Sequence, residues 1–77
     1  MFLKDAEVKE KLTVSEFLTH EKKFIQNLSR FGIYIGTHLE VLGKGPFKSP
    51  LKIKINNNII ALRSHEARLI KVKKGFE

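Results

Sequence analysis

The sequence predicts a mainly β fold, a small barrel of short strands with one short inserted α-helix. The chain has 77 residues, which is enough for one domain with a small core. Apolar residues alternate with polar ones in several short segments, as they do in half-buried strands. Four of the five glycines and both prolines fall between residues 29 and 50, where they separate these segments. Short strands at close spacing favour a barrel over a βαβ fold.

The predicted strands lie on both sides of one helix. The alternating segments are residues 11–17, 37–42, 51–55, 59–63 and 69–73. Residues 56–58 are three asparagines, which tolerate the positive φ of a tight hairpin. Residues 64–68 are predicted to form a single helical turn with Ser64 as its cap. The segment 43–50, rich in glycine and proline, is interpreted as a loop between strands.

The predicted helix spans residues 21–31. Phe24, Leu28 and Phe31 recur there at spacings of four and three, which is the period of an amphipathic helix. Gly32 follows directly, and the left-handed residue that ends many helices forms most easily without a Cβ. We expect the apolar face of this helix to close one side of the barrel core.

The residues give no support for catalysis or for a metal site. The chain has no cysteine, which excludes a disulfide framework, a thiolate zinc site and a thiol nucleophile. His20, His38 and His65 stand too far apart to share one helix face, so we expect no metal ligand. The serines lack a local nucleophile signature, so we expect no catalytic residue, and nothing in the sequence predicts a cofactor. The segment GKGPFKS departs from the phosphate-binding loop pattern, because Phe47 stands before Lys48 where that pattern has glycine.

The excess positive charge lies in the second part of the chain. The formal net charge is +7; residues 1–43 hold 6 basic and 6 acidic residues, and residues 44–77 hold 9 basic and 2 acidic. Such an excess favours nucleic acid, an anionic lipid surface or an acidic protein face as partner. A solvated surface without a partner remains the alternative.

A candidate partner-binding site follows from the spacing of the lysines. Within each of two predicted strands, alternate lysines share one face, and all four ammonium groups point outward together if these strands lie close. Phe47 and Tyr34 could add aromatic contacts for bases, and lysines together with aromatic side chains are the minimum that a surface needs to bind single-stranded nucleic acid. The candidate partner-binding residues are Lys52, Lys54, Lys71, Lys73, Phe47 and Lys48.

The run from Leu28 to Val72 resembles the FeoA family. The residues that carry the resemblance, in chain order, are Leu28, Phe31 with Gly32, Gly36, Pro46, Pro50, Ala61 with Leu62 and Arg63, Glu66 with Ala67, and Ile70 with Val72. Lys48 departs from the usual loop glycine, and Ile35 stands where proline commonly precedes the second glycine. The resemblance covers essentially the whole chain and implies one FeoA-type SH3-like domain over residues 1–77.

The resemblance also implies a function. Members of the family act in bacterial ferrous iron uptake as small, non-catalytic proteins that bind and regulate the FeoB permease from the cytosol. We therefore expect a cytoplasmic protein without a targeting segment, which reaches the anionic inner membrane through its partner. The alternative is a small basic barrel that binds RNA or another nucleic acid. A complete iron-dependent repressor is not expected, because no helix-turn-helix segment precedes the barrel.

Overall fold

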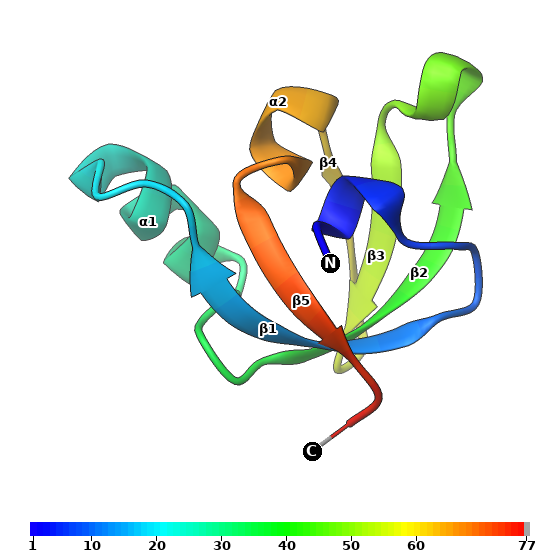
Figure 1. Cartoon of the computed structure of the whole chain (residues 1–77), viewed down its shortest axis with the longest axis horizontal. Coiled ribbons are helices and arrows are strands. Elements are labelled where there is room, and N and C mark those ends of the chain that lie inside the picture. Colours follow the sequence, from blue (N-terminus) through cyan, green and yellow to red (C-terminus); the bar gives the residue numbers. More distant parts are fainter. Residues whose placement is uncertain (77) are drawn as a thin grey trace.

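Five strands form one antiparallel sheet that curls around a single core (Figure 1). The computed structural model describes residues 1–76, without the side chain of Lys48. The strands are β1 Lys11–Phe17, β2 His38–Lys44, β3 Leu51–Ile55, β4 Asn58–Leu62 and β5 Ile70–Lys74. Their order across the sheet is β4-β3-β2-β1-β5, so the last strand returns to pair with the first. The predicted fold, mainly β with one short inserted helix, is confirmed.

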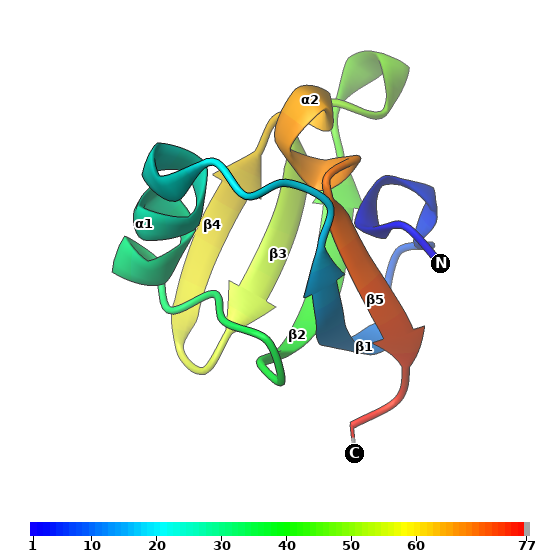
Figure 2. The ribbon, with the colours of Figure 1, turned by 60° about the vertical axis from the view of Figure 1, so that its left-hand side comes forward.

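The inserted helix α1 spans Lys22–Arg30 between β1 and β2, and it lies beside β4 (Figure 2). The other helical segments are single turns: Leu3–Asp5, Pro46–Lys48 and α2, Ser64–Ala67. Among the described residues, none of these helices has the length and apolar character needed to cross a bilayer.

The helix ends at Gly32, as predicted. Gly32 has φ 84°, and its N–H donates to the carbonyl of Ser29 at 3.0 Å. The N–H of Ile33 reaches back to the carbonyl of Leu28 at 2.9 Å. These two bonds are the Schellman arrangement, which satisfies carbonyls at the helix end and favours a residue without a Cβ at the left-handed position. They also turn the chain so that Ile33 becomes buried.

The predicted apolar face of the helix is only partly correct. Leu28 is buried and Phe24 packs against the core, but Phe31 is 48% exposed. Phe31 is the C-terminal cap of α1, with φ −92° and ψ 1°, so its side chain no longer follows the helical face. Ile33 occupies the core position instead, at 1% exposure.

The second helical turn also begins differently from the prediction. The cap position is Arg63 rather than Ser64. The backbone N–H of Arg63 donates to Oε1 of Glu66 at 3.0 Å, so the carboxylate three residues ahead satisfies the free donor. The backbone N–H of Ser64 donates instead to the Oγ of Ser49, at 3.3 Å.

Gly45 stands where the two arms of the β2–β3 loop meet. Its N–H donates to the carbonyl of Pro50 at 2.9 Å, and a Cβ added here would lie 2.5 Å from the carbonyl oxygen of Ser49. We expect Gly45→Ala to lower the free energy of unfolding by about 1–3 kcal/mol, because backbone must move to relieve the contact. Gly43→Ala is the control, since nothing lies within 4 Å of its added Cβ. Urea unfolding of both variants measures the difference. Equal unfolding midpoints for Gly45→Ala and Gly43→Ala would contradict the expected loss of stability.

Candidate partner-binding surfaces

The structure separates the two lysine pairs that were predicted to act together. Lys52 and Lys54 lie on β3, Lys71 and Lys73 lie on β5, and all four side chains are exposed. Strands β2 and β1 stand between β3 and β5 in the sheet. Three strand spacings amount to roughly 14 Å along the sheet, so the four ammonium groups form two separate pairs. The four lysines were predicted to form one surface only if their two strands lie close together, and β3 and β5 do not.

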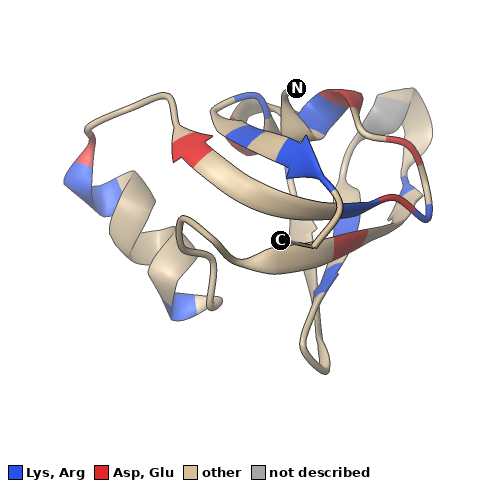
Figure 3. Ribbon diagram, turned by 60° about the horizontal axis from the view of Figure 1, so that its bottom comes forward, with Lys and Arg blue, Asp and Glu red and all other residues tan. Residues whose placement is uncertain are grey.

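Acidic side chains alternate with these lysines on the outside of the sheet. Glu40 of β2 stands opposite Lys54 on one side and opposite Lys11 on the other. Glu16 of β1 stands opposite Lys71. Figure 3 shows acidic segments among the basic ones along the same strands. Opposite charges at directly opposed positions attract, so Lys54 and Lys71 each have a carboxylate opposite them, whereas Lys52 and Lys73 stand opposite uncharged residues.

The aromatic candidates lie at different ends of the molecule. Phe47 is fully exposed with φ 58°, at the end of the β2–β3 loop. Tyr34 is 56% exposed in the α1–β2 connection, and its hydroxyl donates to the carbonyl of Ser29 at 3.2 Å. Figure 1 places these two segments at opposite ends of the sheet. The side chain of Lys48, the last of the predicted site residues, lies outside what the structure describes.

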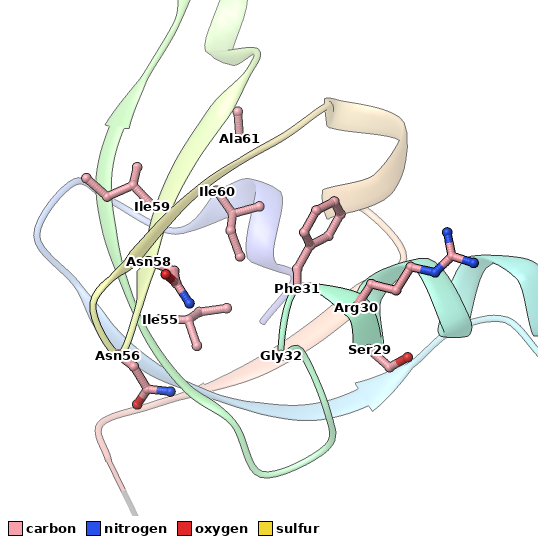
Figure 4. A pocket seen from close by; sticks show the side chains of 10 residues that line it. All are labelled: Ser29, Arg30, Phe31, Gly32, Ile55, Asn56, Asn58, Ile59, Ile60 and Ala61. Carbon is pink, nitrogen blue, oxygen red and sulfur yellow. The ribbon is translucent and has the colours of Figure 1, made fainter.

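The structure contains a hollow that was not predicted from the sequence. It lies between the end of α1 and the β3–β4 hairpin and has a volume of about 630 Å³ (Figure 4). Ile55 and Ile60 project into it, and Phe31 lines the opposite side. Its lining residues are Ser29, Arg30, Phe31, Gly32, Ile55, Asn56, Asn58, Ile59, Ile60 and Ala61. The signal in the sequence was Phe31, which we assigned to the core because its spacing fits the helix.

A smaller hollow, of about 270 Å³, lies where the C-terminal segment crosses the sheet. Phe76 stacks on His38, with ring centroids 4.6 Å apart and ring planes 4° from parallel. The Nζ of Lys11 lies 5.9 Å from the centre of the Phe76 ring, within the range of a cation–π contact. The stack therefore fastens the C-terminal segment to β2.

We expect the isolated protein to bind Fe²⁺ or Zn²⁺ weakly if at all. Among residues 1–76, no three histidine, cysteine or acidic side chains lie close enough together to hold a metal ion. His38 and Glu40 together line the smaller hollow but supply two ligands, and a closed zinc site takes four. Calorimetry on the wild type and on His38→Ala tests this expectation. A stoichiometric, submicromolar site that the single substitution abolishes would contradict it.

Comparison with known proteins gives matches over nearly the whole chain. The FeoA domain family model matches residues 1–74. A Helicobacter pylori protein, named provisionally as Fe(2+) transport protein A, is 37% identical over 57 residues, which are 74% of this chain and 68% of that protein.

Solved structures share the fold. The iron(II) transport protein A from Clostridium thermocellum superposes with a TM-score of 0.87 and 26% identity, over 96% of this chain and 45% of that one. This chain thus spans less than half the length of that protein. The FeoA-like protein from Clostridium acetobutylicum superposes with a TM-score of 0.85 and 28% identity, over 100% of this chain and 88% of that one. The SH3-like barrel expected from the sequence is confirmed by these matches.

Proposed function

The chain belongs to the FeoA family, which is associated with ferrous iron transport, and we propose that it is a non-catalytic accessory protein of ferrous iron uptake. In this proposal it binds the cytosolic region of the FeoB permease and regulates the permease. The observation that carries the proposal is the family match over residues 1–74. The names of the Helicobacter and Clostridium proteins, which refer to Fe(2+) transport, support it.

The first of two proposed contact surfaces lies at the β2–β3 loop. Phe47 presents a fully exposed ring, and an aromatic side chain that becomes buried is a common anchor of protein interfaces. Lys52 lies at the base of the same loop, where it lines a hollow of about 250 Å³ with Gly45 and Pro50. We propose that Phe47, Lys48, Lys52 and Lys54 contact an acidic surface of the permease.

The second surface is the exposed face of β5, with Lys71 and Lys73. Strands β2 and β1 separate this face from the lysines of β3. We therefore propose that Lys71 and Lys73 do not touch the acidic surface that the β2–β3 loop contacts, and that they attract the permease through their electrostatic field. The proposed location is the cytosol, with the membrane reached through the permease. Each Lys or Arg held near an anionic leaflet adds about 1 kcal/mol of attraction, so the net charge of +7 supports that position.

Titration of the protein against the purified cytosolic region of the permease tests the proposed function. We expect a saturable complex whose association rate falls as salt rises, because complementary charges accelerate encounter and salt screens them. Absence of a complex at both low and physiological salt would reject the adapter function.

A second candidate function, binding of RNA or another nucleic acid, is favoured by one observation: all of the excess positive charge lies in residues 44–77. This reading predicts affinity for RNA with a log-log salt slope of about −0.7 to −0.9 per phosphate contacted, hence roughly −3 for four lysines. The same titration with RNA in place of the permease separates the two functions. Binding to RNA with that slope, without binding to the permease, would support the second candidate.

A further inference from the structure

The two edge strands of the sheet, β5 and β4, differ in whether another segment pairs with them. At the β5 edge, the N–H of Val72 donates to the carbonyl of Met1 at 2.7 Å, and Phe2 forms a bridge with Lys71. The N-terminal segment therefore covers that edge. At the other edge, β4 pairs with β3 and has no second neighbouring strand among residues 1–76. Helix α1 lies beside this edge, but the hollow between the helix end and the β3–β4 hairpin leaves space along β4. An edge that pairs with no other strand offers its main-chain groups to an added strand.

The main-chain groups that β4 leaves unpaired belong to alternate residues. A two-residue turn joins Ile55 to Asn58, and these two residues form the closing, hydrogen-bonded pair of the hairpin. Bonded and non-bonded pairs alternate along an antiparallel ladder. Ile60 therefore bonds to β3 like Asn58, whereas Ile59 and Ala61 direct their N–H and C=O groups away from the sheet.

This free edge borders the hollow at the end of α1. Ile59 and Ala61 are both lining residues, and Phe31 faces them from the helix side. In Figure 4, Ile55 and Ile60 point into the space between the hairpin and the helix end, while Ile59 points away from it. An extended chain lying along β4 would thus form hydrogen bonds with the main chain of β4 and apolar contacts with the side chains of Ile55 and Ile60. The volume of about 630 Å³ lies in the range of pockets that hold ligands.

The charges around this edge favour an acidic occupant. Strand β4, with the sequence NIIAL, carries no charge of the kind that usually protects an edge from pairing. Lys54 stands opposite Ile59 and Lys52 stands opposite Ala61 on β3. A strand added to β4 would lie two strand spacings from these lysines, roughly 10 Å, which a long lysine side chain largely bridges. No acidic side chain belongs to the lining of the hollow, within the part of the chain that the structure describes.

We propose that the free edge of β4 accepts an extended segment of a partner protein as a sixth strand. Alternate residues of that segment are apolar and point into the hollow, and the residues between them are acidic and point toward Lys52 and Lys54. Recognition by strand addition draws affinity from main-chain bonds and specificity from alternate side chains. The inference goes beyond the proposed function, because it holds whichever protein supplies the segment.

The first test uses a synthetic eight-residue peptide in which valine alternates with glutamate. Added to ¹⁵N-labelled protein, the peptide is expected to shift the amide signals of Ile59 and Ala61 in a saturable way and to slow their hydrogen exchange. A peptide with lysine in place of glutamate is the charge control. A peptide N-methylated at alternate residues, which removes the donors that strand pairing needs, is the main-chain control. Both controls are expected to bind at least several-fold more weakly.

The second test uses variants of the protein. Ala61→Pro removes an outward N–H, which an edge strand tolerates, and is expected to weaken peptide binding by about tenfold or more. Ala61→Val keeps the donor and is the control. Lys54→Glu is expected to weaken binding by about two- to fivefold, whereas Lys73→Glu, on the opposite edge strand, leaves it unchanged. If Ala61→Pro fails to fold, the N-methylated peptide still tests the same bonds on the wild type.

Three results would overturn the inference. One is the absence of shifts at Ile59 and Ala61 at millimolar peptide. Another is equal affinity of the N-methylated and the unmodified peptide, which would show that main-chain pairing is not involved. The third is movement of the same two amide signals on dilution of the protein alone, with a matching change in sedimentation. That result would assign the edge to a second copy of this chain.

Discussion

Replacing Leu28 by alanine is expected to unfold much of the protein. Leu28 is 1% exposed and is the buried residue of α1, and its carbonyl accepts the N–H of Ile33 at the helix end. Truncating a buried leucine costs about 2–5 kcal/mol. A core in a chain this short rarely supplies more than about 3–5 kcal/mol in total. The loss therefore takes up most or all of the stability, and thermal unfolding followed by circular dichroism would detect it.

Phe31→Ala provides the matched control for this prediction. Phe31 lies three residues further along the chain but is about half exposed, so its removal is expected to cost well under half as much as that of Leu28. An unchanged melting temperature for Leu28→Ala would show that the helix contributes little to the core. A larger loss for Phe31→Ala than for Leu28→Ala would contradict the assignment of the two side chains.

Reversing the charge of the lysines on β3 is expected to slow docking on the permease by about tenfold or more. Steered association gains factors of about 10 to 10³ from complementary fields. Surface substitutions usually change stability by less than about 0.5 kcal/mol. Lys54→Glu costs somewhat more, since it places a second carboxylate opposite Glu40. The double variant Lys52→Glu, Lys54→Glu should therefore remain folded, and stopped-flow mixing with the permease region at two salt concentrations measures the rate.

The two lysine pairs have different proposed roles, a contact for the β3 pair and a field for the β5 pair, so reversing the β5 pair is expected to slow docking less. Lys71→Glu with Lys73→Glu changes the net charge by the same amount on the far side of the sheet. Equal slowing by both double variants would indicate a general effect of net charge rather than a contact at the β2–β3 loop. If both variants dock as fast as the wild type, the lysines belong to a solvated surface and the proposed contact residues are wrong.

The elements of this fold could be predicted from the sequence because the signals for them are local. Alternation places Leu12 and Val14 on the buried face of β1, and both are buried in the structure. The turn before Asn58 and the helix end at Gly32 also depend on a few neighbouring residues. The helical spacing predicted the same buried face for Leu28 and Phe31, but only Leu28 is buried, because Phe31 lies at the end of the helix.

The neighbours of each strand in the sheet could not be predicted from the sequence. Strand order depends on contacts between residues far apart in the chain, which leave no period in the sequence. That order separates Lys52 from Lys71 and leaves β4 with a free edge. It also buries Leu3, because the N-terminal segment covers the edge of β5. The strands, the helix and the family could thus be inferred from local patterns, whereas the surfaces available to a partner arise from long-range pairing.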